Sequence, residues 1–137
     1  MNSRPIIFIV LSLYSTIISA TEGYKCHPKQ ALGREDDGIL RETGYTKILL
    51  NINTEFVVEK ATGKIIGSKG FDNSNGLYGS PKVLDIGSKE QSYKVLTIYQ
   101  PKVSVAYLEI EEFNKNSSKP FTFMDSGIII SGTCEHY

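Results

Sequence analysis

The two cysteines of this 137-residue chain, Cys26 and Cys134, constrain its fold more than any other feature. They lie 108 positions apart, near the two ends of the region that follows an apolar N-terminal segment. In a secreted chain an even pair of cysteines indicates a disulfide. The chain-entropy model values a loop of that size at roughly 4–5 kcal/mol of stabilisation. A fold that contains this bond must bring both ends of the domain together.

A metal site is the alternative that the same region leaves open. Cys26, His27, Cys134 and His136 are side chains of the types that bind zinc. Neither cysteine belongs to a C-x-x-C pair, and an oxidising secretory pathway favours the disulfide. We therefore predict a disulfide between Cys26 and Cys134, with no metal and no cofactor.

The N-terminal segment has the three parts of a secretory signal peptide. Residues 1–5 carry one positive charge, residues 6–18 are mostly apolar, and Ala20 is a small residue before a cleavage site. The apolar stretch is shorter than the roughly 20 residues that span a bilayer. An uncleaved anchor or a buried helix is the alternative interpretation. We predict a signal peptide over residues 1–20 and a single secreted domain over 21–137, without a membrane span.

The mature chain is nearly neutral, since 14 basic residues remain against 15 acidic ones once Arg4 is removed. A balance of this kind argues against a protein that holds nucleic acid mainly by charge. We expect a monomer that binds RNA weakly if it binds RNA at all.

The order of hydrophobic patterns predicts an α+β domain, with a small N-terminal hairpin, one helix and an antiparallel sheet. The hairpin is expected from strands over 23–27 and 39–41, with Pro28 and residues 33–38 as turn material. Apolar residues recur at helical spacing over 45–60, and Gly63 is a typical residue just after the end of a helix. The β-branched residues in this stretch make a strand the alternative.

The remainder of the chain predicts strands. Residues 93–99 and 103–110 alternate in polarity, and Gln100-Pro101-Lys102 separates them, which is typical of a hairpin. Further strands are expected over 64–66, 81–86, 121–124 and 127–133. We expect the two polar loops, 71–80 and 114–120, to carry recognition, because loops on a rigid scaffold commonly do.

Tyr24-Lys25-Cys26, placed soon after a signal peptide, resembles the Tyr-x-Cys motif of secreted effectors of Blumeria-type powdery mildew fungi. Cys134 near the C-terminus and the order of helix and strands are similar to their ribonuclease-like, haustorium-associated family. The resemblance covers the whole mature chain in layout. It implies the fold of small guanyl-specific fungal ribonucleases and delivery into the host cell. It also implies host plant proteins as partners, an intracellular NLR immune receptor among them, and action as an effector or avirulence protein.

The catalytic residues that the ribonuclease fold implies are missing from the expected places. The enzymes carry a His on the first strand after the helix, Glu and Arg on the next strands, and a second His near the last. Here residues 64–67 contain no His, and no Arg follows Arg41. Asp85 or Glu109 alone makes no acid–base site. We predict an inactive scaffold with no catalytic residues. An active secreted ribonuclease and an extracellular inhibitory or structural protein stay open as alternatives.

Two histidines and an acidic cluster have both a functional and a structural interpretation. His27 and His136 could form an acid–base pair, but strand neighbours point to opposite faces and chain ends are commonly exposed. We therefore expect two surface histidines. Glu109, Glu111 and Glu112 are expected at a solvated strand end, with cation binding as the alternative.

An aromatic set and a sequon complete the candidates. Tyr93, Tyr99 and Tyr107 could stack bases, aided by Lys82, Lys94 and Lys102, although such a stripe more often packs in the core. We favour the core. Asn116-Ser117-Ser118 is an N-glycosylation sequon in a polar loop.

Overall fold

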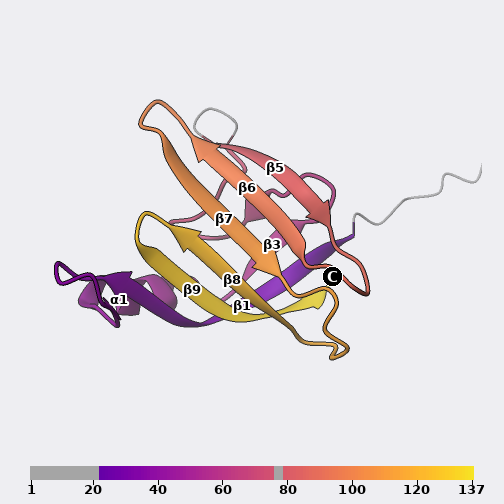
Figure 1. Cartoon of the computed structure of the whole chain (residues 1–137), viewed down its shortest axis with the longest axis horizontal. Helices are drawn as coiled ribbons and strands as arrows, with labels where there is room; N and C mark the ends of the chain where they lie inside the picture. Colours follow the sequence, from indigo (N-terminus) through magenta and orange to yellow (C-terminus); the bar gives the residue numbers. More distant parts are fainter. Residues whose placement is uncertain (1–21, 76–78) are drawn as a thin grey trace, which may run out of the picture.

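The computed structural model describes residues 22–75 and 79–137, so the predicted signal peptide over 1–20 lies outside the described residues. The described residues form one curled antiparallel sheet with a single helix at one end (Figure 1). The strands are β1 (Gly23–Arg34), β2 (Leu40–Arg41), β3 (Phe56–Glu59), β4 (Ile65–Ile66), β5 (Gly79–Ile86), β6 (Tyr93–Tyr99), β7 (Ser104–Ile110), β8 (Lys119–Asp125) and β9 (Ile128–His136), and the helix is α1 (Gly44–Ile52). The predicted α+β class is confirmed, while the ribonuclease-like fold stays a prediction.

The strand order is β4-β3-β1-β9-β8-β7-β6-β5, and β2 lies off this path and pairs with β1. β1 and β9 pair along most of their length, which places the first and last strands side by side. The predicted N-terminal hairpin is present only in part: Gly33 and Arg34 of β1 pair with β2, whereas the predicted strand over 23–27 pairs with β3 and β9. Within the described ranges, no helix has the length and apolar character that crossing a membrane requires.

β1 is much longer than the predicted strand over 23–27, and the assignment of Pro28 to a turn was wrong. Pro28 lies within β1, opposite Gly132, and the register shifts between Pro28 and Gln30. A β-bulge is one of the few sheet positions that tolerate a proline, because the regular hydrogen-bond ladder is interrupted there. The strand therefore continues through a residue that usually marks its end.

The predicted helix over 45–60 was too long. α1 begins after Thr43, whose Oγ1 accepts a hydrogen bond from the backbone amide of Thr46 at 3.1 Å, and it ends at Ile52, with Asn53 as its C-cap. The Asn53 side chain then donates to the Leu49 carbonyl at 2.8 Å, which satisfies an end of the helix. Residues 56–59 form β3 instead, because β-branched residues and alternating burial suit pairing with β1.

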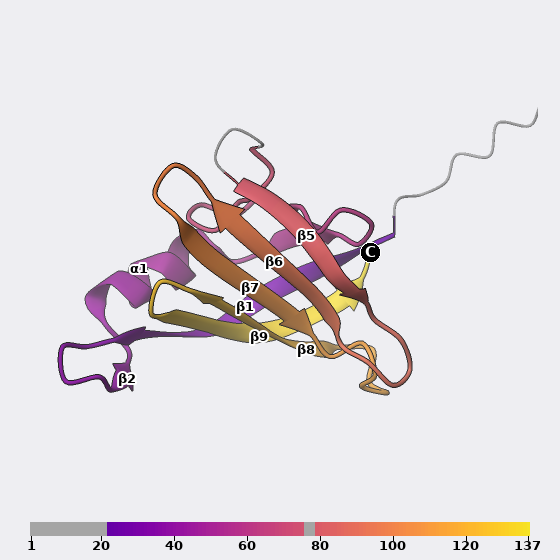
Figure 2. The same cartoon turned by 45° about the horizontal axis from the view of Figure 1, so that its top comes forward.

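The β6–β7 hairpin is confirmed with its predicted first strand, and Tyr93 to Tyr99 pair with Ile110 to Ser104. The sheet curls so that β1 and β9 pass behind β6 and β7 in the view of Figure 2, and hydrogen bonds connect the chain after β3 to β6. The Tyr93 hydroxyl donates to the Lys60 carbonyl at 3.0 Å. The side-chain amide of Asn73 donates to the Gly63 carbonyl and to Thr97 Oγ1. These bonds join the two sides of the curl without a strand ladder.

The inner face of the curl holds the core. Phe56 meets Phe71 and Phe121 edge to face, with ring centroids 5.0 and 5.4 Å apart. Leu49 of α1 is buried with them and covers one end of the curl. The inner face is therefore filled by aromatic and aliphatic side chains from the sheet, from α1 and from the loop that contains Phe71.

Candidate functional site

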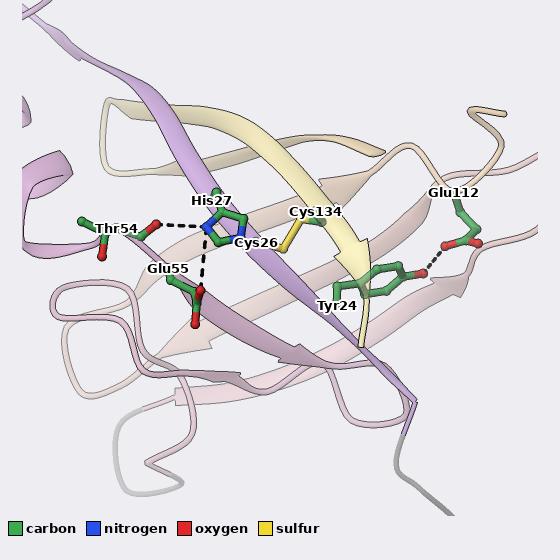
Figure 3. Close-up of a disulfide and its surroundings, with 7 residues drawn as sticks. All are labelled: Tyr24, Cys26, His27, Thr54, Glu55, Glu112 and Cys134. Atoms are coloured by element: carbon green, nitrogen blue, oxygen red, sulfur yellow. Dashed lines mark hydrogen bonds and ion pairs between the residues drawn. A yellow bond between two sulfur atoms is a disulfide. The ribbon is translucent and has the colours of Figure 1, made fainter. Parts of the chain in front are cut away.

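The predicted disulfide between Cys26 and Cys134 is present. The two residues lie directly opposite each other on β1 and β9, with their Cα atoms 3.9 Å apart (Figure 3). Both side chains are fully buried. The disulfide removes both cysteines from metal binding. Among the described residues, no group of three or more His, Cys, Asp and Glu side chains could hold a metal ion.

Tyr24 explains why a tyrosine precedes the cysteine by two positions. Both side chains point to the inner face, because residues two apart on a strand share a face. The buried Tyr24 hydroxyl donates to a Glu112 carboxylate oxygen, and its ring lies 5.1 Å from the Tyr93 ring. Burial, and then the bond to Glu112, raise the pKa of the Tyr24 phenol. Tyr24 thus ties β1 to the segment that follows β7.

The middle residue of the motif points the other way. Lys25 reaches outward and its ammonium lies 3.2 Å from Glu55 Oε1, with both side chains partly exposed. The Tyr-x-Cys pattern therefore has a physical meaning in this fold. Two inward residues carry a buried hydrogen bond and a disulfide, and the residue between them faces outward.

The two histidines lie on opposite faces of the sheet. His136 follows Cys134 by two residues and shares its face, and His136 Nε2 lies 2.9 Å from Glu112 Oε1. His27 is adjacent to Cys26, so it faces away, and its Nδ1 lies 3.4 Å from the Thr54 carbonyl. Their side chains are 50% and 44% exposed, as expected for surface histidines. The geometry does not bring them together.

The three glutamates of the acidic cluster also separate. Glu109 accepts a hydrogen bond from the Tyr107 hydroxyl at 3.0 Å, and Glu111 accepts one from the side-chain amide of Asn114 at 3.3 Å. The Glu112 carboxylate accepts from the Tyr24 hydroxyl and contacts His136 Nε2. Each carboxylate thus has a protein partner of its own, which leaves no shared cation site among them. Asp85, the other candidate carboxylate, accepts from the Gly87 amide at 2.9 Å in a turn.

Lys119 is a buried residue that sequence reasoning missed. It alternates with Phe121 and Phe123 on β8, and it is 9% exposed. Its ammonium donates to the carbonyls of Glu112 and Asn114. The sequence did contain a signal for this burial. Position 119 alternates with two phenylalanines, which places Lys119 on the same inward face of β8. Lys119 holds the connection between β7 and β8 against the disulfide-bonded end of the sheet.

The proposed tyrosine stripe does not exist as one surface. Tyr93 is fully buried and Tyr99 partly buried in the inward row of β6, which agrees with the core interpretation. Tyr107 lies opposite Leu96 on the outward face, so it cannot join them. Burial raises the pKa of Tyr99 and of Tyr107 to about 12. Lys94, which belonged to the alternative base-stacking interpretation, lies opposite Glu109.

The two loops expected to carry recognition differ. In the loop over 71–80, Phe71 and Asn73 are buried in the core, and residues 76–78 lie outside the described residues. In the loop over 114–120, Asn116 is exposed and its amide donates to Asn114 Oδ1 at 3.0 Å. The first loop therefore anchors the fold in its described part, whereas the second presents the sequon to solvent.

A contiguous apolar surface lies on the outward face of the sheet, where sequence reasoning did not place a site. Leu96, Tyr107, Met124 and Ile129 lie opposite one another in a row across β6, β7, β8 and β9. We call these four residues, with the neighbouring Val105, the outer row. Val105 is 48% exposed and Met124 is 40% exposed. An antiparallel sheet usually has a polar solvated face, so apolar residues on both faces were the available signal.

A groove of about 450 Å³ lies where the β1–β2 hairpin meets the outer row. Val105, Tyr107 and Met124 line it from the sheet, and Arg34 and Leu40 line it from the hairpin. Its size is that of a pocket for a small ligand or for a few side chains of a partner. It is a concave, largely apolar site with two charged side chains, Arg34 and Asp125, among its lining residues.

Comparison of the chain with protein-family models, with curated proteins and with solved structures found no match. We therefore infer function from the geometry above and from the resemblance carried by Tyr24, Cys26 and Cys134.

Proposed function

We propose that the protein is a secreted effector that enters a host plant cell and acts by binding a host protein through the outer row. In this proposal the chain is an inactive ribonuclease-like scaffold, and host intracellular immune receptors detect it. The observation that carries the proposal is the partly exposed apolar outer row with its adjoining groove. Function then resides in surface residues placed on a stable scaffold rather than in the fold itself.

The outer row has the properties of a protein-binding surface. It runs without a polar interruption from Leu96 through Tyr107 and Met124 to Ile129. Exposed apolar patches that are contiguous and bordered by polar residues commonly mark interaction sites. Tyrosine and methionine are also enriched in protein interfaces. A near-neutral chain favours a protein partner over a nucleic acid held by charge.

The inner face supports binding rather than RNA cleavage. Cleavage through a 2′-hydroxyl needs a base, an acid and a cation around one phosphate. The described inner face is occupied by the core, and the His136 and Glu112 side chains at its border contact each other and Tyr24. His27 lies on the other face. These positions favour a scaffold that binds.

The experiment is a comparison of proteins retained from host leaf tissue by the mature chain 21–137 and by matched variants. Val105→Lys/Met124→Lys places two charges on the outer row. Ile66→Lys is the control: Ile66 is 47% exposed, and its strand β4 lies at the edge of the sheet. We expect at least one host protein to bind the wild type and Ile66→Lys but not the double variant.

A purified host protein that passes this comparison should bind the mature chain directly, with the same dependence on the outer row. Equal retention by all three chains would contradict the proposal. A fluorogenic RNA assay on the same preparations covers the competing function. Turnover above background that disappears on His136→Ala or His27→Ala would favour an active ribonuclease.

A further inference from the structure

Arg34 occupies a special position at the border of the groove. It ends β1, and its backbone amide donates to the Gly127 carbonyl at 2.8 Å. Its guanidinium lies over Gly127, where the Cζ atom is 3.4 Å from the place that a Cβ atom would take. Gly127 has a positive φ of 83°, a backbone conformation that favours glycine. The hairpin and this turn together aim an exposed guanidinium at the groove.

Arg34 has no carboxylate partner within the described part of the chain. The described ion pairs include the neighbouring Arg41, which forms two bonds to Asp37 at 3.0 and 2.7 Å, but none of them involves Arg34. Asp125 also borders the groove, yet it belongs to the inward row of β8 and accepts from Ser126 Oγ at 2.7 Å. The basic group that lines the groove is therefore available to a partner.

We propose that the groove binds a short segment of a partner protein that brings an apolar side chain together with a carboxylate. This proposal rests on the proposed function, because it names the chemistry of the partner at the outer row. The apolar side chain contacts Val105, Tyr107 and Met124, and the carboxylate accepts hydrogen bonds from Arg34. The planar fork of a guanidinium matches a carboxylate with two parallel hydrogen bonds.

Charge complementarity selects this partner over a purely apolar one. A segment without a carboxylate would cover Arg34 and remove its water without replacing the lost hydrogen bonds, which is costly. An acidic residue beside the apolar one offsets that cost. The same argument disfavours a basic segment, since like charges would meet in the groove.

The test uses a phage-displayed library of random ten-residue peptides, selected on the folded mature chain 21–137. We expect the selected peptides to contain Asp or Glu beside an apolar residue. We expect Arg34→Gln, and Glu→Gln or Asp→Asn in the peptide, each to weaken binding about tenfold, in line with a lost charge-assisted hydrogen bond. Arg41→Gln is the matched control, because Arg41 lies on the same hairpin and is already paired. It should leave binding within about twofold.

Amide chemical shifts locate the binding site independently of the variants. We expect the peptide to shift the signals of Val105, Met124 and Gly127 more than those of Lys119 and Glu112. Since Arg34 is exposed, Arg34→Gln should retain the native spectrum away from the groove. A loss of binding therefore reports the lost contact rather than unfolding.

Several outcomes would overturn the inference: no selected peptide, selected peptides without an acidic residue, or equal binding by Arg34→Gln. Sedimentation that shows a dimer closed through the groove would also overturn it, because a second copy would then be the occupant. Failure of this inference can be distinguished from failure of the proposed function. If Val105→Lys/Met124→Lys abolishes binding of the host protein and Arg34→Gln does not, the outer row stands and only the carboxylate partner is wrong.

Discussion

The two ends of the curled sheet differ in how they use their polar and apolar groups. The disulfide end comprises Tyr24, Cys26, Glu112, Lys119 and Cys134, and its buried polar atoms contact one another. The hairpin end comprises the β1–β2 hairpin, the groove and the turn over 126–127. There Arg34 is exposed and forms no ion pair with a described residue, and Leu40 is 39% exposed. Figure 1 shows these regions at opposite ends of the long strands.

The difference indicates a division between stability and recognition. At the disulfide end a covalent bond, a buried tyrosine and a buried lysine hold the first strand, the last strand and the β7–β8 connection together. Among the described side chains, no buried nitrogen or oxygen lacks a hydrogen-bond partner. Changes at the hairpin end should therefore cost little stability, whereas changes at the disulfide end should cost much.

The largest effect is expected from removal of the disulfide. Cys26→Ala/Cys134→Ala should lower the free energy of unfolding by roughly 4–5 kcal/mol, because the unfolded chain regains the freedom of a loop of 108 residues. Urea denaturation of the mature chain measures this. Arg34→Gln is the control from the hairpin end and should change it by less than about 0.5 kcal/mol. Equal losses of unfolding free energy in the double cysteine variant and in Arg34→Gln would contradict the difference between the two ends.

Tyr24→Phe should have the next largest effect. It removes the hydroxyl that donates to Glu112 and leaves the ring in place, and a hydrogen bond to a charged group contributes about 1.5–3 kcal/mol. Tyr107→Phe is the matched control, because its hydroxyl bonds Glu109 on the partly exposed outward face. We expect the control to lose clearly less in the same denaturation experiment. The reverse order would show that Tyr24 is not a structural anchor.

The pKa of Tyr24 gives the comparison a pH dependence. The folded state raises this pKa above its ordinary value of 10.0, so the unfolded chain loses the proton first as the pH rises. The stabilising contribution of the protonated phenol is therefore complete below pH 10 and decreases above it. Tyr24→Phe should make the fall in stability between pH 10 and pH 11 less steep. An unchanged slope would contradict the burial of this phenol.

Asn116 should give the smallest effect, since it is exposed in the loop at the disulfide end. When the full chain is secreted from yeast, we expect an endoglycosidase-sensitive mass that both Asn116→Gln and Ser118→Ala remove. Stability and partner binding should stay unchanged, because the sequon lies away from the groove. A glycan that weakens binding to the groove would place the contact surface nearer to the β7–β8 connection than we infer.

Local patterns in the sequence predicted part of this fold well. The alternation over 93–99 matched β6 residue for residue, and the cysteine pair predicted which strands meet. The helix was overextended because Phe56 and Val57 continue a helical spacing, and only pairing with β1 reveals them as a strand. Pro28 was read as a turn because a bulge in β1 leaves no clear local signature.

The candidate site was harder to predict than the fold. Leu96, Tyr107, Met124 and Ile129 come from four strands, and only the registers between those strands place them in one row. The groove also needs Arg34 from a hairpin far away in the sequence. Such contacts depend on tertiary structure, whereas Tyr24 and Cys26 could be assigned to one face from alternation alone.

The most direct measurement is the response of host leaves that carry matched immune receptors to the chain expressed without its signal peptide. We predict localised cell death with the wild type and with Ile66→Lys, and none with Val105→Lys/Met124→Lys at equal protein level. Val105→Ser/Met124→Ser, which removes the apolar surface without adding charge, should also reduce the response. Undiminished cell death with both outer-row variants would contradict recognition at the hairpin end, and so would the absence of a response in every host line.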